Sequence, residues 1–316
     1  MISLNTYSFG YLMGLLKSSP TKSWKLKNFI SFCKTKKINS LEFPLDYFLK
    51  KEKISAEKLF LELKKKNIYP IIDLENINLG MIKKLSFLNK EFTFDLIRIK
   101  MSNHFGGNRH EVKDFKKIKH KFILDIKKIL KIIRKTDLKI AIENHQDLTS
   151  NEIIKIVKST SVEKVGINWD IGNSLATIET PEDFFENTKK YILNVHSKDY
   201  KVIKSNVGFF LKRCVIGEGI VDFKKYVNYF KKNNINLSVE LGAHYSRHCK
   251  VYNPAFIYAH KIDMEHLNYF NRYLNQVAVD ENPFTDWEIY KNEKNCYKNE
   301  IKDVNKSVNF IKRIYA

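Results

Sequence analysis

The amino-acid sequence predicts an α/β fold, a closed (β/α)8 barrel of the TIM type with a helical extension at its C-terminus. Two observations carry this prediction. Strand-like and helix-like segments alternate along the chain, and four of the strand-like segments end in a residue that can bind a metal. Polar residues at the C-terminal strand ends of a repeated strand–helix unit are typical of this barrel. The 316 residues exceed the ~250 of a typical barrel, which leaves room for an extension.

Eight strand–helix units can be followed from the first residue. The strand-like segments are short apolar runs, and the segments between them place apolar residues at helical spacing. The predicted strands are residues 2–7, 40–44, 68–74, 96–101, 140–143, 167–170, 193–196 and 237–240. The predicted helices are residues 24–36, 55–66, 81–88, 112–135, 151–158, 181–190, 222–232 and 254–274. Each strand is thus followed by a helix, and the barrel is expected to occupy residues 1–276.

Residues 277–316 are surplus to these eight units. Within them, residues 284–289 and 301–314 have apolar side chains at helical spacing and predict two further helices. A packing appendage or a dimer contact is the simpler interpretation, so a homo-oligomer stays open. An element that covers the substrate is the alternative.

The last four predicted strands share one internal pattern. In each, apolar residues alternate with small or polar residues, so the two kinds of side chain point to opposite faces. The polar face of each strand ends in a metal-capable residue: Glu143, Asp170, His196 and Glu240. If the four strands are parallel neighbours, these ends converge into a divalent-cation site of three carboxylates and one imidazole. For a single strand, a last polar residue that merely meets solvent is the simpler explanation, but the matching pattern of all four favours the site.

The intervals between the four residues support this interpretation. Glu143 to Asp170 and Asp170 to His196 each span about one strand–helix unit. The interval from His196 to Glu240 is longer and has room for one more unit and an inserted loop.

The formal net charge of +21 invites a nucleic-acid partner. However, the lysines are spread along the whole chain, in runs such as Lys64-Lys65-Lys66 that fall on expected helix surfaces. We therefore expect solvated helix faces and no nucleic-acid partner, although a positive field would still steer an anionic substrate.

The cysteines and the apolar segments of the sequence indicate the cellular compartment. The four cysteines form no C-x-x-C pair and no close cluster, which predicts neither a zinc ribbon nor a disulfide framework. No apolar run approaches the ~20 residues that span a bilayer. The first 20 residues have no basic residue before their apolar portion, unlike a secretory signal. A cytoplasmic protein with no membrane partner is expected.

Four motifs resemble those of the sugar phosphate isomerase/epimerase family, whose members have a xylose isomerase-like barrel. They are Ile142-Glu143-Asn144-His145, Asn168-Trp169-Asp170-Ile171-Gly172-Asn173, Val195-His196-Ser197-Lys198-Asp199-Tyr200 and Gly217-Glu218-Gly219-Ile220-Val221-Asp222-Phe223. The resemblance implies that Glu143, Asp170, His196 and Glu240 are metal ligands. By similarity to ketose 3-epimerases, Glu143 and Glu240 would also move the substrate proton. The resemblance further implies that Arg213, shortly before Gly217-Glu218-Gly219, contacts the substrate.

Four further polar residues have inward positions. His145 and Lys198 share the strand face of Glu143 and His196, and for each a substrate-binding role stands against a position on the loop surface. Glu42 and Arg98 lie in the second and fourth predicted strands, where polar residues with satisfied partners inside the barrel are expected.

The ligand set limits the chemistry. Oxygen-rich ligation with one imidazole favours Mn²⁺, Mg²⁺ or Co²⁺, and Zn²⁺ would have its four-ligand shell filled by the protein. A carboxylate that takes a proton beside a carbonyl gives an enediolate, and the proton's return gives epimerisation or isomerisation of a sugar or sugar phosphate. Loss of a β-hydroxyl gives dehydration on the same site.

Two other classes of function use the same barrel. A DNA-repair endonuclease specific for abasic sites needs more histidine ligands, but Asn173 occupies one such position and the expected Asp-x-His pair is missing. A barrel that binds a sugar without catalysis does not need the complete set of four ligands.

Overall fold

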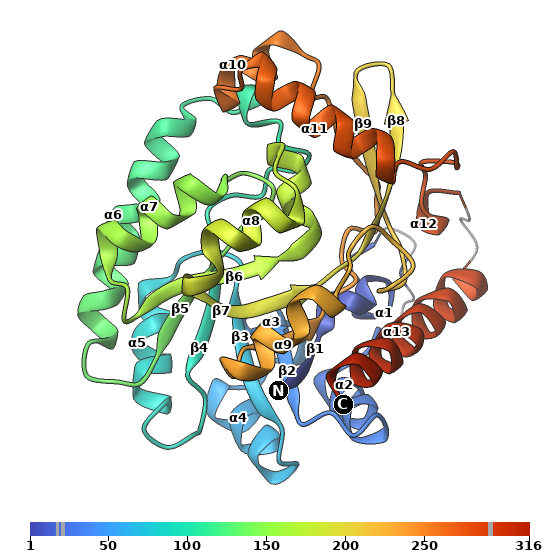
Figure 1. Cartoon of the computed structure of the whole chain (residues 1–316). Helices are drawn as coiled ribbons and strands as arrows, with labels where there is room; N and C mark the ends of the chain where they lie inside the picture. The colour runs from blue at the N-terminus through green and yellow to red at the C-terminus, as the bar shows by residue number, and fades with distance from the viewer. Residues whose placement is uncertain (17–18, 20–22, 290–292) are drawn as a thin grey trace.

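Eight parallel strands close into a barrel in the order β1-β10-β7-β6-β5-β4-β3-β2 (Figure 1). They are β1 (Ile2–Asn5), β2 (Ser40–Pro44), β3 (Tyr69–Leu74), β4 (Leu96–Lys100), β5 (Lys139–Glu143), β6 (Val165–Asp170), β7 (Ile192–Ser197) and β10 (Asn236–Val239). The computed structural model describes residues 1–316 apart from 17–18, 20–22 and 290–292. The predicted barrel is confirmed, and the strand bounds agree within the usual one or two residues.

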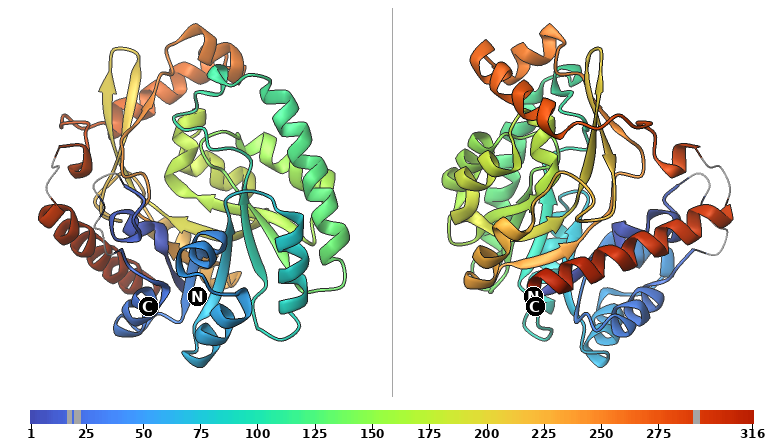
Figure 2. Two further views of the ribbon diagram at one scale, coloured as in Figure 1. Left: turned by 180° about the vertical axis from the view of Figure 1, so that it is seen from behind. Right: turned by 45° about the vertical axis from the view of Figure 1, so that its right-hand side comes forward.

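Helices cover the outside of the barrel between successive strands (Figures 1 and 2). The α-helices up to β10 are α1 (Gly10–Met13), α2 (Leu26–Thr35), α3 (Leu45–Glu52), α4 (Ala56–Lys65), α5 (Leu79–Leu88), α6 (Phe115–Ile133), α7 (Ser150–Thr160), α8 (Pro181–Thr188) and α9 (Lys224–Lys232). Short 3-10 helices are η1 (Thr6–Phe9), η2 (Arg109–Glu111), η3 (Ile171–Thr177) and η4 (Lys189–Tyr191). Among the helices of the described residues, none is long and apolar enough to cross a membrane.

Local sequence explains where the helices near the site begin. Thr149 caps α7, because its hydroxyl accepts from the Glu152 N–H while the Glu152 carboxylate accepts from the Thr149 N–H. Thr180 caps α8 in the same position, and Pro181 follows at the first helical residue, where its missing N–H costs nothing.

A three-stranded antiparallel sheet rises beside the C-terminal end of the barrel. Its strands are β8 (Tyr200–Ser205), β9 (Gly208–Arg213) and β11 (Arg247–Cys249), in the order β11-β9-β8. The insertion expected between His196 and Glu240 is therefore a β-hairpin. Its apolar side chains form a cluster of their own with residues of the two helices that follow, including Phe209, Leu211 and Phe270.

The predicted helix 254–274 is two helices, α10 (Pro254–His260) and α11 (Met264–Val277). Lys261 ends α10 in the left-handed conformation, with φ 56°, and the Asp263 side chain caps α11. Both helices contribute to the cluster of the small sheet, and the single helix predicted for residues 254–274 is interrupted between His260 and Met264.

The C-terminal residues supply a helix that packs on β10. The predicted helices 284–289 and 301–314 appear as α12 (Asp286–Ile289) and α13 (Glu293–Tyr315). α13 lies along the outside of the barrel, where it contacts β10, α9 and α1 (Figure 2). Its Val304, Val308 and Ile311 are buried in the main core. α13, which was expected outside the eight strand–helix units, therefore packs against the barrel. The division of the chain at residue 276 stays a prediction.

Candidate metal centre and active site

The four metal-capable residues come from four neighbouring strands. Glu143 ends β5, Asp170 ends β6, His196 lies in β7 and Glu240 directly follows β10. These strands are adjacent in the order β10-β7-β6-β5, and Asp170 lies opposite His196 in the register. Because parallel strands bring their carboxyl ends to one edge, all four side chains reach the same end of the barrel interior.

Their donor atoms converge in a buried space. His196 Nδ1 lies 3.9 Å from Glu143 Oε2 and 3.8 Å from Glu240 Oε2. Glu143, Asp170 and His196 each offer an atom within 4.8 Å of the others, as a shared cation would require. All four residues are buried.

Unpartnered donor atoms show that these residues fit a divalent cation. Asp170 Oδ1, His196 Nδ1 and Glu143 Oε2 are buried and have no hydrogen-bond partner among the described residues. Glu143 Oε2 does form an ion pair with the Arg98 guanidinium. Buried polar atoms are nearly always satisfied, and an oxygen-rich set with one imidazole suits Mg²⁺, Mn²⁺ or Co²⁺.

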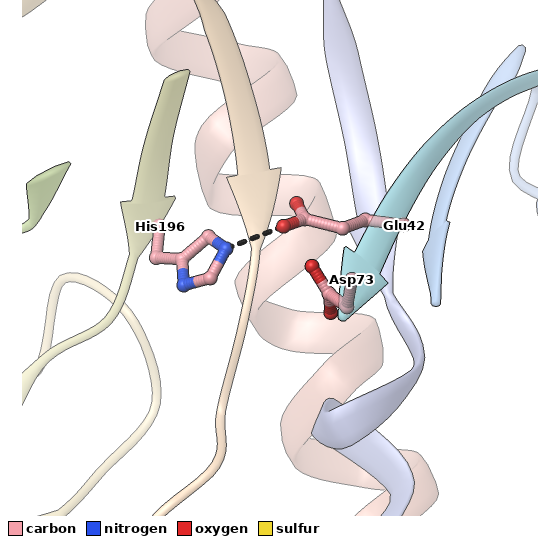
Figure 3. A group of neighbouring side chains, drawn as sticks. All are labelled: Glu42, Asp73 and His196. Atoms are coloured by element: carbon pink, nitrogen blue, oxygen red, sulfur yellow. Dashed lines mark hydrogen bonds and ion pairs between the residues drawn. The ribbon is translucent and has the colours of Figure 1, made fainter. Parts of the chain in front are cut away.

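The Nε2 atom of His196 is held by Glu42, which was expected only to be a polar residue with hydrogen-bond partners inside the barrel. His196 Nε2 and Glu42 Oε1 are 2.6 Å apart, and the two side chains point toward each other across the barrel interior beside Asp73 (Figure 3). Burial opposes the charged forms of both groups, but their mutual attraction raises the pKa of His196 to about 10 and lowers that of Glu42 to about 2. The Glu42 contact therefore leaves Nδ1 as the nitrogen that faces Glu143 and Glu240.

Glu42, Asp73 and His196 are themselves close enough to share a cation. However, the Glu42–His196 contact already uses His196 Nε2, and Asp73 is paired with Arg98 Nε at 3.8 Å. We therefore assign this group to the support of His196.

Lys198 lies among the carboxylates. Its Nζ is 2.6 Å from Asp170 Oδ2 and 2.5 Å from Glu240 Oε2. Burial alone would lower the pKa of Lys198, but Asp170 and Glu240 raise it well above its usual value. Burial raises the pKa of Asp170 to about 7, against the opposing effect of Lys198. The structure thus places Lys198 in the site, as an ammonium that compensates two of the four proposed ligands.

A cavity of about 170 Å³ opens onto this centre. Its lining includes Arg98, Glu143, His145, Lys198, Glu240 and Arg247. His145 therefore faces the cavity and not a loop surface. Burial and the cations around it hold the pKa of His145 well below its usual value, so the imidazole is neutral at physiological pH. The volume lies below the roughly 300–1,000 Å³ of pockets for drug-sized ligands, which indicates a small ligand.

Arg213 is not among the residues that line the cavity, and its contact with the substrate stays a prediction. Its Nη1 donates to the Leu241 carbonyl at 2.8 Å, its Nη2 lies 3.5 Å from Asp303 of α13, and its guanidinium lies 4.0 Å from the Trp287 ring. The side chain therefore faces Trp287 of α12 and Asp303 of α13. The structure places Arg213 behind the site, where it ties the C-terminus to the segment after Glu240.

Two asparagines fix Asp170. Asn144 donates to the Asp170 carbonyl at 3.0 Å and accepts from the Asp170 N–H at 2.7 Å. Asn173 donates to Asp170 Oδ2 at 2.7 Å, in the position where the endonuclease pattern would have a histidine. The asparagine therefore orients a carboxylate and does not extend the set of imidazole ligands.

Comparison with known proteins gives a family model and two curated relatives. The model of the xylose isomerase-like TIM barrel family matches residues 92–265, more than half of the chain. The uncharacterised protein YihM of Escherichia coli (strain K12) is 26% identical over 189 residues, which are 60% of this chain and 57% of that protein. The 3-oxo-isoapionate decarboxylase of Pectobacterium atrosepticum is 27% identical over 108 residues, 33% of this chain and 39% of that enzyme. The chain thus spans less than two thirds of the length of either relative.

Solved structures share the fold at low identity. A xylose isomerase-like barrel protein from Mycobacterium smegmatis in complex with magnesium is 13% identical, with a TM-score of 0.58 over 87% of this chain and 96% of that chain. A D-psicose 3-epimerase from Clostridium cellulolyticum H10, solved with D-tagatose, is 12% identical, with a TM-score of 0.53 over 87% and 96%. The probable 3-DHS dehydratase AsbF of Bacillus anthracis is 15% identical, with a TM-score of 0.54 over 76% and 92%. The chain belongs to the xylose isomerase-like TIM barrel family.

Proposed function

We propose that the protein is a divalent-metal-dependent isomerase or epimerase of a sugar or sugar phosphate. The observation that carries this proposal is the convergence of Glu143, Asp170, His196 and Glu240 beside a small polar cavity. Within this group Asp170 Oδ1 and His196 Nδ1 are buried without a hydrogen-bond partner among the described residues. These four residues would hold Mn²⁺, Mg²⁺ or Co²⁺, with Zn²⁺ as the less suited alternative. The bound cation would supply the Lewis acidity that stabilises the negative charge of an enediolate.

Glu143 and Glu240 are the proposed acid–base pair. Both line the cavity, and their strands β5 and β10 flank β6 and β7, so the two carboxylates stand on either side of Asp170 and His196. This position suits removal of a proton beside a carbonyl by one carboxylate and its return by the other. Each is oriented by a buried cation, Glu143 by Arg98 and Glu240 by Lys198.

Lys198 also keeps Glu240 ready to act as a base. Burial would raise the pKa of Glu240, but Lys198 and His196 together lower it below its usual value. The carboxylate is therefore ionised at neutral pH, as a proton acceptor must be.

Dehydration of a sugar or polyol is the second candidate, because loss of a β-hydroxyl follows from the same intermediate. It needs a proton donor for the leaving hydroxyl, and the charged Lys198 faces the cavity. We propose neither a nuclease nor a protein that only binds sugar. The free cysteines of the described residues suit a reducing compartment, and we propose that the enzyme acts on small molecules in the cytoplasm.

Solvent hydrogen exchange tests the proposed proton transfer. Candidate sugars and sugar phosphates are incubated with the Mn²⁺-loaded protein in D₂O, and deuterium beside the carbonyl is measured by NMR. Glu143→Gln and Glu240→Gln should each reduce exchange about 10²–10⁴-fold, while Glu62→Gln on the exposed face of α4 should not. Metal occupancy is measured in every variant. Full exchange in a metal-loaded double variant would show that another residue moves the proton, and a product that has lost water would favour the dehydratase.

A further inference from the structure

The cationic side chains that line the cavity differ in whether they form ion pairs with carboxylates. Arg98, Lys100, Lys198 and Arg247 all line it. The first three are engaged by carboxylates: Arg98 and Lys100 share Glu75 at 3.4 and 2.7 Å, and Lys198 bridges two proposed metal ligands. In the part of the chain that the structure describes, Arg247 forms no ion pair, although Glu288 and Glu240 act on it at longer range, and its buried Nε has no hydrogen-bond partner. Arg247 is therefore the cationic side chain of the cavity that is available to bind an anionic group of a ligand.

Arg247 is held in place by the backbone and by an aromatic ring. It lies in β11 and pairs with Leu211 of β9 in the small antiparallel sheet. Its guanidinium carbon lies 3.7 Å from the centre of the Phe105 ring. Stacking on a ring orients a guanidinium without using its N–H groups, so these donors stay free for a planar or tetrahedral anion.

The same ring connects Arg247 to His145. The centroids of Phe105 and His145 are 4.9 Å apart, so the three side chains form one continuous wall of the cavity. His145 Nδ1 is buried without a hydrogen-bond partner among the described residues. The loop that carries Phe105 is fixed in turn, because the Gly106 N–H donates to Gln146 Oε1 at 2.7 Å. The wall thus combines a preorganised cation with an unsatisfied polar atom.

We propose that this wall, defined by Phe105, His145 and Arg247, is a subsite for an anionic group of the substrate, a carboxylate or a phosphate. The inference rests on the proposed function, since the metal centre lies across the same cavity, and it narrows the substrate class to sugar acids or sugar phosphates. A neutral sugar would leave the partly buried Arg247 guanidinium without an anionic group within ion-pair distance. The net charge of +21 is consistent with this class, because it attracts anionic ligands.

Calorimetric titration of simple probes tests the subsite. The probes are inorganic phosphate, the four-carbon sugar acid D-erythronate and the neutral polyol erythritol. They are titrated into the protein with and without Mn²⁺. The wild type should bind at least one of the two anions with an affinity about 10-fold or more above that for erythritol. Arg247→Gln should lower the affinity for that anion about 10- to 100-fold. Preference for phosphate would indicate a sugar phosphate, and preference for erythronate a sugar acid.

Lys250→Gln is the matched control, since it removes one positive charge just beyond β11 at a side chain that is 43% exposed. This variant should bind the probes as the wild type does. Equal anion binding by the wild type and Arg247→Gln, or no binding of either anion by the wild type, would overturn the subsite. Mn²⁺ affinity is measured in the same samples and should be equal in both proteins. Failure of the wild type to bind Mn²⁺ would count against the proposed function, whereas the comparison of anion binding in metal-free protein judges the subsite alone.

Discussion

His196 uses its two ring nitrogens for different purposes. Nε2 lies 2.6 Å from Glu42 Oε1, and Nδ1 lies within 4 Å of carboxylate oxygens of both Glu143 and Glu240. A hydrogen bond at one nitrogen decides which nitrogen is free to bind a metal, and such partners of a ligand histidine affect metal affinity. Glu42 is thus a positioning residue for the metal centre.

The first prediction follows from this contact. Glu42→Gln keeps the shape of the side chain but removes the charge that orients His196, and it should weaken Mn²⁺ binding about 10- to 100-fold. Glu62→Gln, an exposed substitution of the same kind, should leave Mn²⁺ affinity unchanged. Isothermal titration with Mn²⁺ measures both. Wild-type affinity in Glu42→Gln would mean that Glu42 only fills the barrel interior.

A second prediction concerns Lys198, which neutralises Asp170 and Glu240. Lys198→Met should lower the free energy of unfolding of chelator-treated protein by about 3–5 kcal/mol, because it leaves buried carboxylates without a counter-charge. Mn²⁺ should restore most of this loss. Lys201→Met is the control, since it breaks a partly exposed pair with Glu281 that is worth about 0–1 kcal/mol. Urea unfolding with and without Mn²⁺ is the measurement, and an equal loss in both conditions would contradict charge compensation by Lys198.

A third prediction separates the two arginines near the cavity. Arg213→Ala should destabilise the protein by about 2–4 kcal/mol, because the Leu241 carbonyl, Asp303 and Trp287 all lose a partner. Its Mn²⁺ affinity and anion binding should be unchanged. Arg247→Ala, which breaks no ion pair among the described residues, should weaken anion binding while Mn²⁺ affinity stays unchanged and the free energy of unfolding falls by less than in Arg213→Ala. Weakened anion binding by Arg213→Ala without a loss of stability would restore the role that the family resemblance implied.

A fourth prediction uses the pH dependence of stability. Glu152 lies 2.7 Å from Arg109 and 2.9 Å from Lys119, and these cations outweigh burial and lower the pKa of Glu152 to about 2 from its usual 4.5. Because the folded-state pKa is depressed, the stabilisation is complete above pH 4.5 and is lost as the pH falls toward 2.

Glu152→Gln should therefore cost about 1–3 kcal/mol at pH 7, a value reduced by solvent screening at a side chain that is 21% exposed. The difference from the wild type should narrow as the pH is lowered below 4.5. Thermal unfolding at a series of pH values measures this, and a difference that is constant over the series would rule out the ionised carboxylate as its cause.

The barrel and the convergence of its strand ends could be predicted because both depend on local periodicity. A strand with period two assigns each side chain to a face, and parallel neighbours then bring Glu143, Asp170 and His196 together without further information. The same periodicity places Trp169 on the outer face, where it packs against Phe184 and Phe185 of α8.

The remaining features depend on contacts between distant segments. Arg213 and Arg247 both lie in strands of the small sheet, but Arg213 contacts Trp287 and Asp303 near the C-terminus, whereas Arg247 lines the cavity. The break between α10 and α11 falls at Lys261, which adopts the left-handed conformation. Because lysine has no preference for this conformation, the break could not be predicted from the sequence. Glu42 occupies an inward-facing position of β2, which could have indicated a role at the site. However, its partner His196 is far away in the sequence, so the contact between them could not be predicted.

The metal content of the purified protein tests the central claim most directly. Protein loaded with Mn²⁺ and freed of excess metal is analysed by elemental analysis, for the wild type, for Asp170→Ala, His196→Ala and for the control Asp222→Ala, His120→Ala, which alters the same residue types at exposed positions. The account predicts about one Mn²⁺ per chain in the wild type and the control, and almost none in Asp170→Ala, His196→Ala. Full metal retention in that variant, or a wild type that binds no divalent cation, would contradict it.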